Sequence, residues 1–253
     1  RQSGGTLADT SAVTLSSIPP QGLNPNEPSG YLKITEQPLS TATADGWHVE
    51  SGNPTSASDA SAPRSPSGIL RASYPAGFSS GSPPWAIDYT FSGGRSSLYY
   101  NLDFKLSPNF EGENSGTNKL GFVWINDGPG VFLSAEGVNA GTLVAQVRLQ
   151  LTPGSDARDH LVPNQGGSGA ITRGEWHRWE VQLVANSAGN SDGIARWWLD
   201  GVLVGDYTNV KFAPSGGGHT WQYISLYPIW GGVGDRVTNS MTIDFDHIYV
   251  SGK

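Results

Sequence analysis

Short segments in which apolar and polar residues alternate recur along the chain from Tyr31 onward, separated by clusters of Gly, Pro, Asn and Ser. A period of two is that of a β-strand, whose successive side chains point to opposite faces. Among 253 residues, 34 Gly and 17 Pro weaken helix interiors and favour turns, which argues against a helical bundle. The segments predicted as strands are 31–34, 69–73, 86–91, 97–106, 120–125, 143–151, 176–184, 194–199, 202–204, 222–226 and 241–250.

Many short strands joined by turns are typical of an all-β sandwich or jelly roll. We find no helix longer than a turn, no internal repeat and no linker within the body of the chain. The predicted fold class is therefore all-β, a two-sheet antiparallel β-sandwich. Residues 1–28, rich in Ser, Pro and Asn, are predicted to form an N-terminal arm, and residues 29–253 a single jelly-roll domain.

The formal net charge of −7, with no cluster of Lys or Arg, argues against nucleic acid and anionic membranes as partners. An acidic polymer stays compatible, because it needs only a few local cations in a cleft. Without Cys the chain has no disulfide and no thiolate nucleophile, and no apolar run reaches the ~20 residues that span a bilayer. Richness in Ser, Thr, Gly and Trp, with a start at Arg1 that indicates a removed leader, predicts a secreted or periplasmic protein. We expect a monomer.

Two of the predicted strands carry a polar face opposite an apolar one. The polar residues are Tyr99, Asn101, Asp103 and Lys105 in 97–106, and Gln146, Arg148 and Gln150 in 143–151. Amide, guanidinium and phenol groups on one open face are typical of a surface that contacts sugars. The alternative is an ordinary solvated face, which an antiparallel sheet has by default.

A third candidate surface lies in residues 221–232, where alternation places Tyr223 and Tyr227 on one face. Aromatic rings spaced along a strand can stack on the apolar faces of pyranose rings. Trp230, just before a Gly-Gly pair, is predicted to join this surface, with packing in the core as the alternative.

Three motifs in the C-terminal half form a strand, a Gly/Asn/Asp turn and a strand with an Asp-Gly hairpin turn. They are Gly174-Glu175-Trp176-His177-Arg178-Trp179-Glu180-Val181, the turn 186–193, and Trp198-Leu199-Asp200-Gly201. With the last strand-like segment, 243–251, they resemble the concanavalin-A-like jelly rolls, and among these the alginate and glucuronan lyase families. The motifs cover about the last third of the chain and build scaffold rather than cleft. His177 and His247 are predicted to be structural.

This resemblance implies a site in the middle of the chain. The lyases have a Lys-Leu-Pro-Gly stretch, then a small polar residue and an Arg that alternate on a strand, then two tyrosines. Lys119 and Arg148 match the Lys and Arg, and Gln146 takes the small polar position. The proline and the tyrosine pair are absent, and the region of the pair ends at His160.

The leading hypothesis is therefore a lyase that cleaves an acidic, uronate-containing polysaccharide by β-elimination. The uronate carboxylate is expected to contact Arg148, Gln146 and Asn101, with Lys119 assisting the proton transfer. The groups proposed to move the proton are His160, Tyr99, Tyr223 and Tyr227. Gln150 and Trp230 complete the predicted binding residues.

Two other functions stay open. A non-catalytic carbohydrate-binding module or lectin-like domain would use the same cleft without chemistry. A glycoside hydrolase is the third hypothesis, weakened because the Glu-x-Asp-x-x-Glu strand of jelly-roll glucanases does not occur. No cofactor is required, and Asp244 and Asp246 are the residues predicted to bind a structural Ca²⁺, if one is present.

Overall fold

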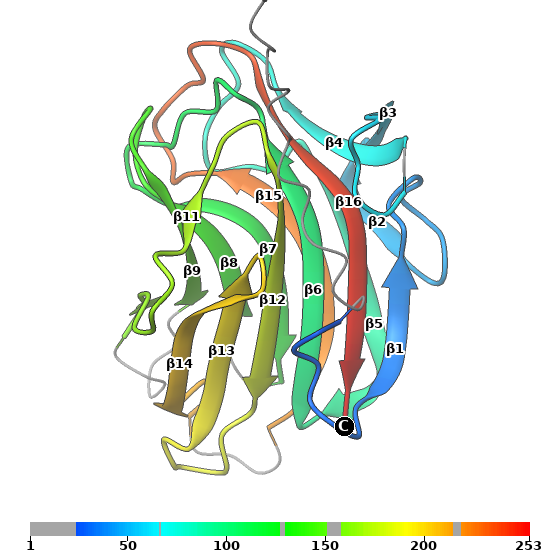
Figure 1. Ribbon diagram of the computed structural model, residues 1–253, viewed down its shortest axis with the longest axis vertical. Helices are drawn as coiled ribbons and strands as arrows, with labels where there is room; N and C mark the ends of the chain where they lie inside the picture. Colours follow the sequence, from blue (N-terminus) through cyan, green and yellow to red (C-terminus); the bar gives the residue numbers. More distant parts are fainter. Residues whose placement is uncertain (1–23, 66, 127–129, 151–157, 215–218) are drawn as a thin grey trace, which may run out of the picture.

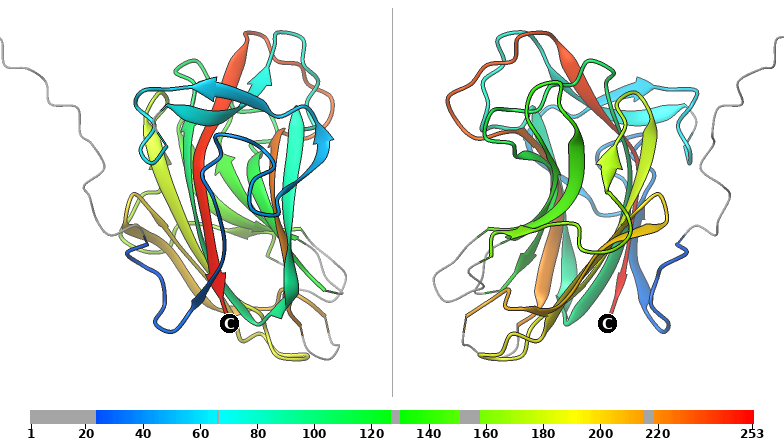
Figure 2. Two further views of the ribbon diagram at one scale, coloured as in Figure 1. Left: turned by 90° about the vertical axis from the view of Figure 1, so that its right-hand side faces the viewer. Right: turned by 60° about the vertical axis from the view of Figure 1, so that its left-hand side comes forward.

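A computed structural model describes residues 24–65, 67–126, 130–150, 158–214 and 219–253. These residues form strands β1 to β16, without a helix, in two antiparallel sheets of eight strands each (Figure 1). The two sheets lie face to face as layers of a sandwich (Figure 2). The predicted all-β jelly roll is confirmed. Within the described part of the chain, no helix could cross a membrane.

Sheet A faces the viewer in Figure 1. Its order is β14 (Val202–Val210), β13 (Gly193–Leu199), β12 (Trp176–Val184), β6 (Ser97–Leu106), β16 (Met241–Gly252), β4 (Gly68–Tyr74) and β3 (Thr55–Ser58), with β1 (Leu32–Gln37) also paired to β16. Sheet B lies behind it. Its order is β10 (His160–Leu161), β9 (Leu143–Leu149), β8 (Gly130–Glu136), β7 (Asn118–Ile125), β15 (Trp221–Trp230), β5 (Trp85–Arg95) and β2 (His48–Gly52), with β11 (Ala170–Ile171) also paired to β9.

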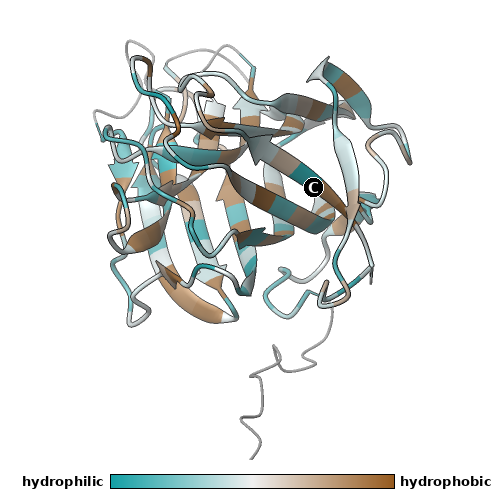
Figure 3. Cartoon of the chain, turned by 90° about the horizontal axis from the view of Figure 1, so that it is seen from above, coloured by the Kyte–Doolittle hydropathy of each residue, from teal (hydrophilic) through white to brown (hydrophobic). Residues whose placement is uncertain are grey.

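The core fills the space between the sheets, and apolar and polar residues alternate along many strands (Figure 3). One buried cluster contains residues of both sheets, including Phe104 and Trp179 from sheet A and Val123 and Val147 from sheet B. The indole N–H of Trp197 donates a hydrogen bond of 3.1 Å to the carbonyl oxygen of Ala145, which joins β13 to β9. Because the inward faces supply this core, any site on sheet B must lie on its outward face.

Every segment predicted as a strand overlaps an observed strand, and β6 and β12 have the predicted bounds. Five strands of the structure lie outside the predicted segments: β2, β3, β8, β10 and β11. Four of these have five residues or fewer, too short for a periodic pattern to stand out. In β8 the outward residue Phe132 is as apolar as the inward Val131 and Leu133, which hides the alternation.

Two of the motifs that resemble those of the lyases are joined by the hydrogen-bonded pair of His177 and Asp200. His177 Nδ1 lies 2.7 Å from Asp200 Oδ2, and the other oxygen of Asp200 accepts 2.8 Å from the backbone N–H of Arg178. Burial alone would lower the pKa of His177, but the hydrogen bond and charge of Asp200 outweigh it and the pKa is raised. Asp200 and Gly201 adopt the positive φ that the hairpin turn requires. The contacts confirm His177 as a structural histidine.

A buried carboxylate in sheet A forms an ion pair with the segment that precedes β4. Asp103 in β6 has no exposed surface and accepts hydrogen bonds from Arg64 Nε at 2.8 Å and Arg178 Nε at 3.1 Å. Both guanidinium groups are about nine-tenths buried, at 6% and 10% exposure. Buried charges are tolerated only when they are paired, so these three groups depend on one another.

The two aspartates predicted as Ca²⁺ ligands have protein partners. Asp244 binds the guanidinium of Arg71 with bonds of 2.7 and 2.8 Å, and Asp246 accepts from the backbone N–H groups of Arg64 and Ser65. No group of three acidic or histidine side chains suited to a metal occurs among the described residues. Calcium binding stays a prediction.

Candidate functional site

The outward face of sheet B holds two hollows that share Lys119 and Gln150, and together they form what we call the groove. The cationic hollow, of ≈ 360 Å³, is lined by Ser115, Thr117, Lys119, Phe132, Arg148, Gln150, Gly231 and Gly232. The tyrosine hollow, of ≈ 320 Å³, is lined by Glu50, Lys119, Phe122, Trp124, Gln150, Tyr223, Ser225, Tyr227 and Ile229. Residues from β2, β7, β8, β9 and β15 thus meet along one continuous surface.

Lys119 reaches the groove because β7 contains a β-bulge. Lys119 pairs with Ser134 and Gly121 with Leu133, so one extra residue of β7 lies between two consecutive partners. Leu120 consequently turns into the core, and Lys119 joins Phe122 on the outward face. Gly121 suits the bulge, since a Cβ there would come within 2.9 Å of the carbonyl oxygen of Ser225 on β15.

The floor of the groove is a row of aromatic rings. Tyr223 stacks on Trp124 with ring centroids 5.6 Å apart, and Trp124 stacks on Phe122 at 5.3 Å. Phe122 continues the row to Phe132 at 5.1 Å, and Tyr227 meets Phe122 edge-on at 5.8 Å. Flat rings of this kind offer the apolar faces on which sugar rings can stack.

The two cations of the groove differ in how they are held. Arg148 contacts Thr117, and its guanidinium lies 3.1 Å from Glu136 and 3.3 Å from Asp159. Lys119 makes no hydrogen bond or ion pair with the described residues, and its ammonium lies 5.2 Å from the ring centre of Phe132. Burial and the charge of Arg148 lower the pKa of Lys119, against the opposing effect of Glu136. Lys119 is therefore the cation available to an incoming anion.

The far end of the tyrosine hollow is acidic. Burial raises the pKa of Tyr223, and the nearby carboxylates of Glu50 and Asp88 raise it further. Burial also raises the pKa of Asp88. It raises the pKa of Glu50 as well, and the charge of Asp88 adds to the effect on Glu50. Tyr223 consequently keeps its proton at neutral pH and can act as a proton donor.

Most of the predicted site residues lie on this face. Lys119, Arg148, Gln150, Tyr223 and Tyr227 line the hollows, as does the Gly-Gly pair after Trp230.

Two further predicted residues flank the cationic hollow. Gln146 precedes Arg148 by two residues on β9, and its amide oxygen is buried without a hydrogen-bond partner. His160 is the cross-strand neighbour of Arg148, is exposed, and has its Nε2 3.3 Å from Asp159. Residues directly opposite each other in an antiparallel pair share a face, so His160 lies beside Arg148.

Tyr99 and Asn101 are not part of this surface, and the prediction that they share it with Arg148 is wrong. Both lie on β6 in sheet A and have no exposed surface. The Tyr99 hydroxyl donates 2.5 Å to Glu180, and the Asn101 amide donates 2.5 Å to Asn24. Residues 24–27, which belong to the predicted arm, bond to the polar side chains on this face of sheet A and cover them, so the face is interior. Residues 1–23 of the arm lie outside the described part of the chain.

Trp230 packs in the core rather than in the groove. Its ring belongs to the buried cluster between the sheets, and its indole N–H donates 2.8 Å to the carbonyl oxygen of Glu111. The alternative that the ring is a core residue is the one the structure supports.

Sequence reasoning missed Phe122, Trp124, Phe132, Glu50 and Asp88. Strict alternation from Lys119 puts Phe122 and Trp124 on the opposite face, and only the bulge brings them together. Glu50 lies in a bulge of β2, and Asp88 is placed next to Ser225 by the pairing of β5 with β15. The aromatic spacing of 122 and 124 was the one signal present in the sequence.

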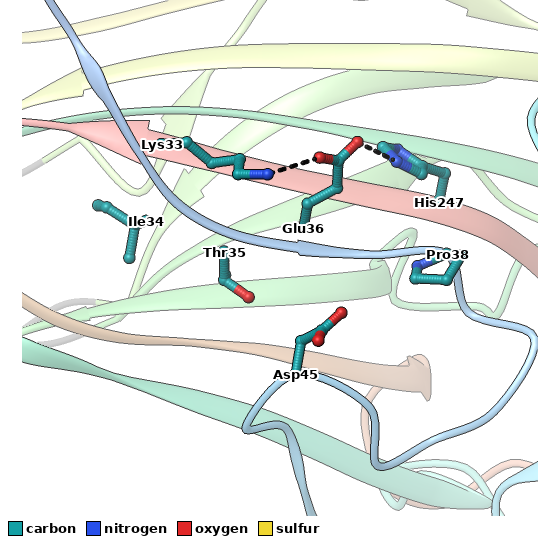
Figure 4. A pocket seen from close by; sticks show the side chains of 7 residues that line it. All are labelled: Lys33, Ile34, Thr35, Glu36, Pro38, Asp45 and His247. Carbon is teal, nitrogen blue, oxygen red and sulfur yellow. Dashed lines mark hydrogen bonds and ion pairs between the residues drawn. The ribbon is translucent and has the colours of Figure 1, made fainter.

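A third hollow, of ≈ 490 Å³, lies on sheet A beside β1 and β16 (Figure 4). Its lysine and histidine both bind Glu36, which is 3.3 Å from Lys33 and 3.0 Å from His247 Nε2, and Asp45 also lines the hollow. Unlike Lys119, the basic groups of this hollow already have a partner, so we place the candidate site in the groove.

No protein-family model and no curated protein sequence matches the chain. Solved protein structures do match the chain. The endo-β-1,4-glucuronan lyase of the fungus Trichoderma reesei matches with a TM-score of 0.61 at 14% identity, over 88% of this chain and 96% of the lyase. A marine alginate lyase from Aplysia kurodai has the same TM-score of 0.61 and identity of 14%, over 88% of this chain and 100% of its own.

A carbohydrate esterase from a Shiga toxin-encoding bacteriophage matches with a TM-score of 0.55 at 15% identity, over 88% of this chain and 100% of the esterase. One fold thus carries more than one named activity, and at these identities the likeness is one of fold. The chain has the jelly-roll fold that alginate and glucuronan lyases share.

Proposed function

We propose that the protein is a polysaccharide lyase that binds an acidic glycan in the groove and cleaves it at a uronate by β-elimination. The observation that carries the proposal is the Lys119 ammonium, which has no hydrogen bond or ion pair among the described residues and lies where two hollows meet over an aromatic floor. The fold shared with lyases that act on uronate polymers supports it.

In β-elimination the bond from C5 to hydrogen and the bond from C4 to O4 break, and a C4–C5 double bond forms. Negative charge grows on the uronate carboxylate as the C5 proton leaves, so a cation beside that carboxylate lowers the barrier. Lys119 supplies this charge, and the amide of Gln150 lies in the same hollows. Arg148, held by Glu136 and Asp159, adds positive potential from a fixed position.

The proton transfers are assigned to groups around Lys119. Tyr223, whose pKa is raised by burial and by neighbouring carboxylates, donates a proton to the departing O4. Two groups are available to accept the C5 proton: His160, beside Arg148, and Tyr227, in the tyrosine hollow. The variants His160→Ala and Tyr227→Phe distinguish them, because loss of the acceptor lowers kcat and loss of the other group does not.

The experiment that tests the reaction follows the ultraviolet absorbance of unsaturated uronate ends across alginate, glucuronan, pectate and glycosaminoglycans. We expect at least one polymer to yield this product. If none does while one still retards the protein in an affinity gel, the groove belongs to a binding module. New reducing ends without the absorbance would instead identify a glycoside hydrolase.

The pH dependence tests the role of Lys119. A lysine carries its charge below its pKa, and burial together with Arg148 lowers that pKa. We therefore expect kcat/KM to fall as the pH rises through a value below that of an ordinary lysine. In Lys119→Arg the guanidinium stays charged at alkaline pH. We therefore expect that the kcat/KM which remains in this variant no longer falls over the same alkaline range. An unchanged fall in Lys119→Arg would assign the titration to another group.

A further inference from the structure

The two halves of the groove carry opposite charge. Arg148 lies in the cationic hollow and Lys119 at the junction of the two hollows, whereas Glu50 lines the tyrosine hollow alone. Asp88 is the cross-strand neighbour of Ser225, another lining residue of the tyrosine hollow. Adjacent sugar units of one bound chain would therefore meet different electrostatic environments.

The acidic end has no described lysine or arginine ion-paired to it, and His48, the cross-strand neighbour of Asp88, is the basic group whose charge acts on Asp88. Glu136, near the cationic hollow, is ion-paired with Arg148, but neither Glu50 nor Asp88 forms an ion pair with a described lysine or arginine. The charge of Asp88 is close enough to act on Glu50, as the raised pKa of Glu50 shows. A third carboxylate brought into this hollow would be repelled by both.

The same end suits an uncharged sugar. The stacked rings of Trp124 and Tyr223 offer a flat apolar surface, and unpaired carboxylates accept hydrogen bonds from sugar hydroxyls or from an amide N–H. The sugar joined to the uronate at O4 belongs here, because Tyr223, the proposed donor to O4, lines this hollow.

We propose that the groove selects an acidic heteropolysaccharide, in which a uronate in the cationic hollow carries at O4 an uncharged or amino sugar in the tyrosine hollow, over a polymer of uronates alone. This inference rests on the proposed function. Glu50 and Asp88 are its specificity-determining residues.

The test compares kcat/KM on two probes of defined chemistry. Hyaluronan alternates glucuronate with an N-acetylated amino sugar, and polyglucuronate carries a carboxylate on every unit. We expect the wild type to prefer the alternating polymer, and Glu50→Gln or Asp88→Asn to reduce the ratio of the two kcat/KM values about tenfold, since like-charge repulsion is removed. Glu175→Gln, at an exposed acid before β12 in sheet A, is the matched control and leaves the ratio unchanged.

The outcomes separate the two proposals. If lyase product forms but the wild type favours polyglucuronate, or the ratio does not respond to either substitution, the selectivity inference fails and the lyase survives. If no polymer yields product, the lyase fails, and affinity-gel retardation by the same two polymers tests selectivity. If both polymers retard the wild-type protein equally and Glu50→Gln leaves this retardation unchanged, the inference is overturned.

Discussion

Lys119→Ala should lower kcat/KM for uronate elimination about 10²–10³-fold, the usual cost of removing one group that stabilises developing charge. The reason is that Lys119 is the cation of the groove that makes no hydrogen bond or ion pair with a described residue, so its ammonium is available to the substrate. Because charge on the carboxylate grows only as the C5 proton leaves, we expect most of the loss in kcat rather than in KM.

Initial rates of unsaturated uronate formation measure this effect. The matched control is Lys33→Ala on β1 of sheet A, whose side chain is 59% exposed and which should keep the wild-type rate. An unfolding curve of Lys119→Ala close to that of the wild type shows that the loss is chemical. A Lys119→Ala enzyme within twofold of the wild type would move the site away from the junction of the hollows.

Asp103→Ala should destabilise the fold by about 3–5 kcal/mol, because removing one member of a buried ion pair leaves uncompensated charge. Here two guanidinium groups lose their shared partner: Arg64 and Arg178 are 6% and 10% exposed and both bond to this carboxylate. The free energy of unfolding of a typical domain is about 5–15 kcal/mol, so the variant loses a large part of it.

Urea denaturation at neutral pH measures the change. Asp206→Ala is the control, since Asp206 pairs with Arg196 at 2.9 Å but the two side chains are 25% and 30% exposed. We expect that substitution to cost about 1 kcal/mol or less, as partly solvated pairs do. Equal effects of the two substitutions would mean that the Asp103 network is solvated in solution.

The fold was predictable because local pattern and turn chemistry agree along most of the chain. In β12 and β6 the alternation is regular, and the motif around His177 and Asp200 marks a strand and its hairpin. The short edge strands were not predicted, because two to five residues are too few to show an alternating pattern. Their pairing depends on neighbours far away in sequence.

The site was predictable where its strands are regular. Arg148 alternates cleanly with buried neighbours in β9, and Tyr223 and Tyr227 lie four residues apart on one face of β15. Alternation tells which residues share a face of a strand, but not whether another segment covers that face. Tyr99 and Asn101 show this limit, since residues 24–27 cover them from about 75 residues away in the sequence.

The bulge at Lys119 also changes how such chains should be sought in genomes. A search pattern built on regular strands would place the basic residue an even number of positions before the aromatic pair. Here the interval from Lys119 to Phe122 is three, as in Lys-x-x-aromatic-x-aromatic. A pattern with that odd spacing, and with glycine at its third position, should retrieve proteins of unassigned activity that whole-chain sequence comparison leaves unconnected.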